Sequence, residues 1–99
     1  MQFIVIAYDY TDEKAYDRRM AVRESHLQQA EEFFKSGKWL YAVGIMDDHD
    51  KLIGSMIVCD FNSREEMQRQ WLYDEPYVTG KVWEKITIHR ALIPPHLLD

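Results

Sequence analysis

The sequence predicts an α+β fold in which four strands and two helices follow one another in the order β-α-β-β-α-β. Three observations indicate this order. Four apolar segments of strand length begin at Phe3, Trp39, Leu52 and Trp83, and β-branched or aromatic residues are frequent in them. The two segments that separate them carry start and stop signals typical of helices. A short polar loop joins the second and third apolar segments, as in a hairpin.

The first strand is predicted over residues 3–9. Its side chains are apolar at both odd and even positions, which is the pattern of a strand that is buried on both faces. One face carries Phe3, Val5 and Ala7, and the other carries Ile4, Ile6 and Tyr8.

The first helix is predicted to run to about Ser36. Thr11 or Asp12 is suited to cap its start, and Gly37 is the kind of residue expected just past its end. At roughly 24 residues the helix is long for a globular domain, so a break near residues 17–22 is compatible with the pattern.

A helical wheel gives this helix one apolar stripe, which is formed by Tyr16, Met20, Leu27, Ala30 and Phe34. Arg23 projects from the centre of the stripe and His26 from its margin. A charged group aimed at a core is costly unless it is paired. Either this part of the helix faces a polar pocket, or the stripe is rotated from its predicted position.

The second and third strands are predicted over residues 39–46 and 52–61, and both are again apolar on both faces. Gly44 interrupts the first of them, and Gly54 and Ser55 interrupt the second. These small residues would leave room for a ligand, or they would allow close contact between subunits.

The second helix is predicted over residues 64–73. Ser63 and Glu66 have the spacing of a capping box, in which each side chain accepts a hydrogen bond from the other residue's backbone. Pro76 ends or re-aims the helix, and residues 75–81 then form one more short turn.

The last strand is predicted over residues 83–92, and Pro94 and Pro95 stop it. The complete order is that of the ferredoxin-like fold, here as one domain over residues 1–99, with an antiparallel four-stranded sheet and both helices on one face. The second sheet face is also apolar, and no further element is available to cover it. Large exposed apolar faces mark interfaces, so we expect a homodimer closed sheet to sheet.

The composition excludes several classes of protein. A net charge of -5 argues against a nucleic-acid partner, and no apolar run has the roughly 18–20 residues needed to cross a membrane. The first residues resemble a strand, not a signal peptide, and a single cysteine cannot form an internal disulfide. No spacing of histidines, cysteines or glycines is typical of a metal or phosphate site. We therefore expect a cytoplasmic protein that contacts no nucleic acid or membrane and uses no metal or cofactor.

His26 is the strongest candidate for chemistry, because a histidine suits acid–base work near neutral pH. The simpler interpretation is a half-buried histidine that makes one hydrogen bond. Asp74 and Glu75 lie where the second helix ends. Since both helices cover the same sheet face, either acid would approach His26 across a groove and orient it, unless these residues form only a turn.

Two other charged residues accompany this candidate pair. Arg23 lies one turn before His26, where it would neutralise the same carboxylate, clamp an anionic substrate or form a structural ion pair. Asp9, at the end of the first strand, would face the same cleft or only cap the next turn. Cys59 is interpreted as a core cysteine.

Several short motifs follow one another along the chain: Arg23-x-x-His26-Leu27, Gly44, Gly54-Ser55, Glu75-Pro76-Tyr77-Val78 and Gly80-x-Val82-Trp83-Glu84. This ordered set resembles the YCII-related domain family over nearly the whole chain. The resemblance implies a dimeric ferredoxin-like α+β barrel, similar to muconolactone isomerases, and a site built on the histidine and a helix-end acid. Arg23, Ser55 and Tyr77 are the candidate substrate-binding residues.

The resemblance also limits what is expected of the site. Most members of the family have no assigned reaction, and a few relatives act as dehydrochlorinases on chlorinated intermediates through a histidine–aspartate pair. The family commonly has Asp before Pro-Tyr or Pro-Phe, whereas this chain has Glu75 there and Asp74 one place earlier. The acid that partners His26 is therefore left open. A proline often found between the arginine and the histidine is replaced by Glu24-Ser25, which favours a continuous helix.

We therefore expect a cofactor-free small-molecule enzyme of the lyase or isomerase type, with no reaction assigned. His26 would act as general base beside a carbonyl or enol, Asp74 or Glu75 would orient it, and Arg23 would bind the anionic part of the substrate. The alternative is a non-catalytic dimeric module that binds a small metabolite in the same cleft.

Overall fold

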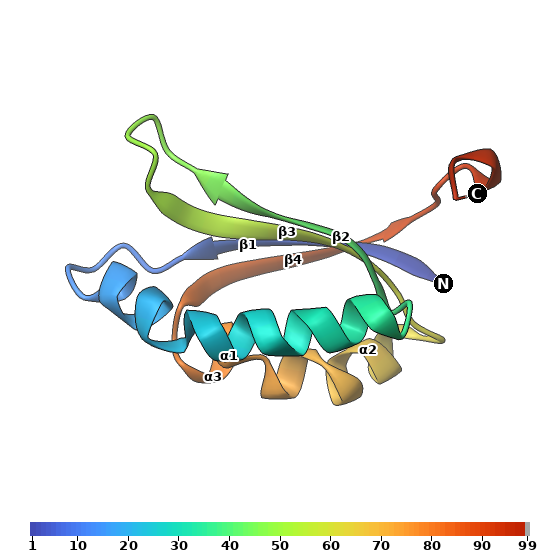
Figure 1. Ribbon diagram of the computed structural model, residues 1–99, viewed down its shortest axis with the longest axis horizontal. Helices are drawn as coiled ribbons and strands as arrows, with labels where there is room; N and C mark the ends of the chain where they lie inside the picture. The colour runs from blue at the N-terminus through green and yellow to red at the C-terminus, as the bar shows by residue number, and fades with distance from the viewer. Residues whose placement is uncertain (99) are drawn as a thin grey trace.

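The computed structural model describes residues 1–98 (Figure 1), and Asp99, the last residue of the predicted domain, lies outside the described residues. Two short 3₁₀ turns accompany the helices and strands, at Leu72–Asp74 and Pro95–Leu97. In chain order the main elements are β1 (Gln2–Asp9), α1 (Ala15–Lys35), β2 (Trp39–Met46), β3 (Leu52–Asp60), α2 (Arg64–Gln70), α3 (Pro76–Thr79) and β4 (Trp83–Ala91).

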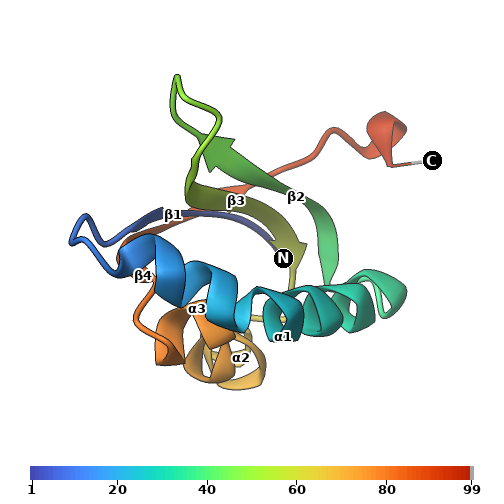
Figure 2. The ribbon, with the colours of Figure 1, turned by 60° about the vertical axis from the view of Figure 1, so that its left-hand side comes forward.

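The predicted ferredoxin-like fold is confirmed. The strands form one sheet in the order β2-β3-β1-β4, and each neighbouring pair is antiparallel. The helices all lie on one face of this sheet, as Figures 1 and 2 show from two directions. The residues that follow β4 extend away from the helical layer toward the C-terminus (Figure 1).

The core lies between the helices and the inner face of the sheet. Val5 of β1 stands opposite Ile57 of β3, and both are almost fully buried. Aromatic rings fill the space beneath the helices, with the centroids of Trp39 and Trp71 4.9 Å apart. Burial of such large rings supplies much of the hydrophobic stabilisation of a small domain.

Helices α1, α2 and α3 leave the opposite face of the sheet, which we call the outer face, uncovered (Figures 1 and 2). Apolar residues of the strands lie on this face. The register brings Ile4, Val58 and Tyr41 into one row across three strands, and Ile6, Met56 and Val43 into the next. These side chains are only partly buried, and Tyr41 is 65% exposed. The pattern of strands that are apolar on both faces therefore corresponds to one covered face and one uncovered face.

Helix α1 begins later than its predicted cap. The expected cap at Thr11 or Asp12 is wrong, because the helix starts at Ala15 and its N-cap residue, Lys14, makes no side-chain capping bond. The Asp12 carboxylate accepts from the Lys14 backbone at 3.2 Å, before the helix begins, and the guanidinium of Arg18 holds it through two hydrogen bonds of 2.8 Å. The other end is as predicted, with Gly37 just beyond the helix at a φ of 77°.

The helix is continuous through residues 17–22, and its buried side differs from the predicted stripe. Within α1 the buried residues are Ala15, Arg19, His26 and Ala30. Of the five residues in the predicted stripe only Ala30 is buried. The other four are exposed, with relative exposures between 36% for Tyr16 and 47% for Leu27. The predicted stripe is rotated from the buried side because it places His26 only at its margin and leaves Arg19 out, whereas each is buried with an acid partner.

Helix α2 is shorter than predicted and ends at Gln70. One half of its predicted capping box is present, since the Ser63 hydroxyl accepts from the Glu66 backbone at 3.1 Å. The Glu66 carboxylate instead accepts hydrogen bonds from the side chains of Asn62, Arg69 and Gln70. Pro76 re-aims the chain and begins the separate helix α3. None of the helices described within residues 1–98 is both long enough and apolar enough to span a membrane.

Candidate functional site

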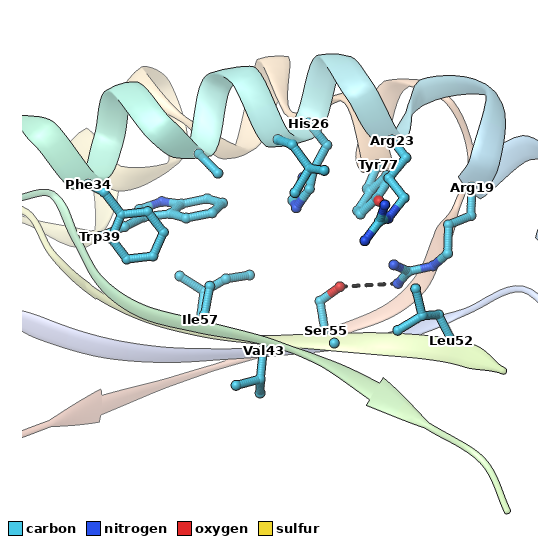
Figure 3. Close-up of a pocket in the computed structure, with 14 residues that line it drawn as sticks. Arg19, Arg23, His26, Phe34, Trp39, Val43, Leu52, Ser55, Ile57 and Tyr77 are labelled. Atoms are coloured by element: carbon cyan, nitrogen blue, oxygen red, sulfur yellow. Dashed lines mark hydrogen bonds between the residues drawn. The ribbon is translucent and has the colours of Figure 1, made fainter. Parts of the chain in front are cut away.

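A cavity of about 220 Å³ lies between α1 and the inner face of the sheet (Figure 3). Its lining has a polar end and an apolar end. Arg19, Arg23, Ser55 and Tyr77 gather at one end, whereas Phe34, Trp39 and Ile57 form the other, and His26 lies between them (Figure 3). This volume is below the roughly 300–1,000 Å³ of pockets for drug-sized ligands, so it suits a molecule of about one ring.

His26 and Glu75 form a hydrogen-bonded pair, with Nδ1 of the histidine 2.6 Å from Oε1 of the glutamate. Both side chains are buried, since His26 is 8% exposed and Glu75 is 0% exposed. The structure thus brings Glu75, and not its neighbour, to the histidine. Asp74 lies on the surface at the end of the 3₁₀ turn.

Local backbone chemistry turns Glu75 inward. A residue before proline is driven into an extended conformation, and Glu75 has φ −61° and ψ 124°. Pro76 occupies the first helical position of α3, where proline is favoured. Glu75 is therefore the N-cap of α3, and its Oε1 accepts a hydrogen bond of 3.1 Å from the Tyr77 backbone.

The Glu75 carboxylate receives three hydrogen bonds, because the indole Nε1 of Trp71 also donates to its Oε2 at 2.6 Å. When this carboxylate is ionised it only accepts hydrogen bonds, and Nδ1 of His26 is then the donor toward it. In the neutral imidazole the other nitrogen, Nε2, then carries the lone pair. Within residues 1–98 no hydrogen-bond partner is recorded for Nε2, and His26 lines the cavity.

Aromatic rings hold the imidazole in place. The ring of Tyr77 stacks on His26 with centroids 3.9 Å apart and an interplanar angle of 14°. Trp39 and Trp83 lie at 5.9 and 6.1 Å from the same ring. Burial raises the pKa of the Tyr77 hydroxyl, against the opposing effect of the Arg19 and Arg23 charges. Tyr77 therefore keeps its proton well into the alkaline range.

A second buried ion pair closes the polar end of the cavity. The Nε and Nη2 of Arg19 donate to the Asp9 carboxylate at 2.7 and 3.0 Å. Nη2 also donates to the Gly54 carbonyl at 3.0 Å and to the Ser55 hydroxyl at 3.1 Å. The guanidinium carbon lies 4.6 Å from the centre of the Tyr77 ring.

The predicted substrate-binding residues all line this cavity. Arg23 has an exposed side chain and no ion pair within residues 1–98. Ser55 is buried and holds Arg19, and Tyr77 forms the wall between the arginines and His26 (Figure 3). Asp9 does not line this cavity, and it contacts the site only through its ion pair with Arg19.

Sequence reasoning missed Arg19 altogether. One signal was available, since Arg19 and His26 are seven residues apart and therefore share a helix face. Placing Arg19 on the buried side with Ala15 and Ala30 would have given the observed orientation of α1.

The two strand glycines have different surroundings. A Cβ at Gly54 would come within 2.5 Å of the Ala7 carbonyl oxygen on the neighbouring strand, so close approach between strands requires glycine there. Gly44 lines the cavity, where a Cβ would meet only the flexible end of Leu52, at 2.5 Å. Of these two glycines, only Gly44 is therefore placed where a small residue would leave room for a ligand.

Comparison with solved structures finds several similar folds, among them the following two. The 5-chloro-2-hydroxyhydroquinone dehydrochlorinase (TftG) from Burkholderia phenoliruptrix AC1100, in complex with 2,5-dihydroxybenzoquinone, has a TM-score of 0.80 at 16% identity, over 97% of this chain and 98% of that chain. An antibiotic biosynthesis monooxygenase has a TM-score of 0.53 at 13% identity, over 93% and 99% of the two chains. A search of curated proteins finds no match. At these identities the similarities establish the fold.

The fold and the cavity define the class of protein: a ferredoxin-like α+β domain, similar to dimeric α+β barrel proteins, with a small cavity beneath its long helix. The YCII-related domain matches residues 1–91, which is most of the chain. The protein belongs to the YCII-related domain family.

Proposed function

We propose that this protein is an enzyme that acts on a small molecule without a cofactor, by lyase or isomerase chemistry with His26 as the general base. The observation that carries the proposal is the 2.6 Å contact between Nδ1 of His26 and the buried Glu75 carboxylate, on an imidazole that lines the cavity. A carboxylate in this position fixes the tautomer and stabilises the imidazolium that forms when Nε2 takes a proton.

The proposed reaction begins at a carbon next to a carbonyl or enol. Nε2 of His26 takes a proton from that carbon, and the electron pair of the broken C–H bond forms a C=C bond. If the adjacent carbon is tetrahedral and carries chlorine, as in the diketo tautomer of a chlorinated hydroxyhydroquinone, the same electron flow expels chloride, and the net change is loss of HCl. If the proton returns at another carbon, the net change is isomerisation. Both routes need a base of suitable geometry and no redox partner.

The similarity to TftG favours the first route. That protein is a dehydrochlorinase and was crystallised with 2,5-dihydroxybenzoquinone, a single-ring molecule. The cavity of about 220 Å³ accommodates a ligand of that size. Chlorinated hydroxyhydroquinones are therefore the first substrates to test.

The working form of this enzyme in our proposal is a homodimer joined through the outer face of the sheet. The apolar rows that contain Val58 and Met56 are continuous across three strands. Leaving such a face in water is unfavourable, and a second copy presents the same self-complementary surface.

The test is chloride release from 5-chloro-2-hydroxyhydroquinone, followed by ion chromatography. We expect His26→Gln to lower the rate by roughly 10²–10⁴-fold, as for loss of a general base. His49→Gln is the matched control, because His49 lies in the exposed turn after β2, and it should retain the wild-type rate.

Two outcomes would contradict the proposal. Chloride release that persists in His26→Gln would remove the histidine from the reaction. Binding of the compound without any release of chloride or exchange of ring protons in D₂O would instead favour the non-catalytic binding module.

A further inference from the structure

The buried hydrogen bonds that hold the Arg19 side chain leave one of its guanidinium nitrogens, Nη1, without a hydrogen-bond partner within residues 1–98. Its Nε and Nη2 make every hydrogen bond recorded for the guanidinium within residues 1–98. Nη1 makes none, yet it is not among the buried polar atoms that lack a partner. In Figure 3 this end of the guanidinium points into the cavity, below Arg23. Nη1 is therefore a donor that faces the cavity from a residue that is itself only 2% exposed.

The polar end of the cavity carries a surplus of positive charge. Arg19 and Arg23 both line it, and Asp9 neutralises Arg19. The other carboxylate nearby, that of Glu75, is engaged with His26 beyond the Tyr77 ring. Two guanidinium groups side by side repel each other, and an anion placed between them would relieve that repulsion. The surplus of positive charge at this end of the cavity contrasts with the net charge of -5 of the whole chain.

Arg19 is also held rigidly, which matters for binding. Four hydrogen bonds to Asp9, Gly54 and Ser55 fix its guanidinium, and the Tyr77 ring packs against it. A donor that is already fixed loses little conformational entropy when a ligand binds. Guanidinium groups are suited to planar oxyanions, because their N–H groups match the geometry of a carboxylate.

The far end of the cavity has the opposite character. Phe34, Trp39 and Ile57 present rings and methyl groups there (Figure 3). A ligand that satisfies both ends must carry an anionic oxygen group on one side and an apolar ring on the other. His26 lies between the two ends (Figure 3).

We propose that Nη1 of Arg19 and the guanidinium of Arg23 together bind the anionic oxygens of a single-ring substrate, a ring carboxylate or enolate, whose ring lies against Trp39. Asp9 acts as a positioning residue, because it holds Arg19 without contacting the ligand. The inference rests on the proposed function, because it takes this cavity as the substrate site. It adds the class of substrate and the orientation of the substrate in the cavity.

The test compares two probes of nearly equal shape, salicylate and salicylamide, of which only the first is an anion at pH 7. Dissociation constants are measured by calorimetry on the full chain. Each charge-assisted hydrogen bond favours the anion, so we expect wild-type protein to bind salicylate roughly tenfold more tightly than the amide. In Arg23→Gln and in Arg19→Gln the two probes should bind with about the same dissociation constant.

Arg18→Gln is the matched control, since Arg18 is on the same helix but pairs with Asp12 outside the cavity. It should keep the full preference for salicylate. Arg19→Gln leaves Asp9 buried without its partner and is checked for folding by circular dichroism. If it does not fold, Arg23→Gln still decides, because Arg23 makes no hydrogen bond within residues 1–98 that the fold requires.

The proposal is overturned if the amide binds as tightly as salicylate or if Arg23→Gln keeps the preference. It is also overturned if the dissociation constant of salicylate lies above roughly 10 mM. These outcomes are separate from turnover. An anion preference without chloride release would support this inference and contradict the proposed reaction. Chloride release without an anion preference would support the proposed reaction and contradict this inference.

Discussion

Tyr77 lies flat against His26, with ring centroids 3.9 Å apart and planes inclined by 14°. The Arg19 guanidinium lies over the same tyrosine, 4.6 Å from the ring centre. The tyrosine ring therefore forms a common wall between two buried pairs, Asp9 with Arg19 and Glu75 with His26. Its packing and its hydroxyl can be examined separately by substitution.

Tyr77→Leu should lower the free energy of unfolding by about 2–4 kcal/mol, because it removes a buried ring on which two cationic or aromatic groups rest. Tyr77→Phe should lower it by less than about 1 kcal/mol, since no hydrogen bond is recorded for the hydroxyl within residues 1–98. Urea denaturation measures both values. Equal losses in the two variants would mean that the hydroxyl, and not the stacked ring, stabilises this region.

Glu75→Gln should destabilise the protein by about 2–4 kcal/mol, because a buried carboxylate that accepts three hydrogen bonds becomes an amide with fewer acceptor positions. Asp74→Asn is the adjacent control and should change stability by less than about 0.5 kcal/mol, as for an exposed site. The comparison uses chemical denaturation at one pH. A larger effect at Asp74 would mean that the inward-facing acid had been misassigned.

The Cys59 thiol should be inert in the folded protein. Burial, with a smaller contribution from the charge of Asp60, raises its pKa from 9.0 to about 12. A raised folded-state pKa gives a stabilising contribution that is present below about pH 9 and is lost as the pH rises toward 12. Alkylation by iodoacetamide at pH 9 should be slow in native protein and fast in urea. Similar rates in both states would contradict the burial of this thiol.

Val58→Glu should dissociate the proposed dimer, because it places a charge in the middle of the outer face between Ile4 and Tyr41. Sedimentation velocity should show wild-type dimers and variant monomers at the same protein concentration. Met20→Glu adds the same charge to an exposed apolar position on α1, in the opposite layer, and should leave the dimer intact. A wild-type monomer would refute the sheet-to-sheet assembly.

The order and position of the main elements were predictable because their signals are local. Strand β2 has the predicted limits, and Gly37 follows α1 as expected. The start of α1 was not predictable in the same way. Asp12 is a good capping residue by type, but a bidentate contact with Arg18 competes for its carboxylate, and such a contact depends on the folded path of the chain.

The candidate site was predictable in part. The histidine and the pair of helix-end acids were recognised, but choosing between Asp74 and Glu75 required the backbone conformation that Pro76 imposes on the residue before it. The burial of Arg19 could not be inferred from composition, because a guanidinium is buried only where an acid such as Asp9 meets it. That meeting joins the end of β1 to the second turn of α1.

The Glu75 carboxylate joins three parts of the chain, since it binds His26 of α1, Trp71 at the end of α2 and the backbone of Tyr77 in α3. A YCII-related chain without catalytic activity would still need the acid to hold these parts together. Selection for a folded chain would therefore preserve the same glutamate that the proposed reaction requires. The presence of the acid in a relative therefore says little about whether that relative is an active enzyme, and the unpaired nitrogens that face the cavity are the better guide.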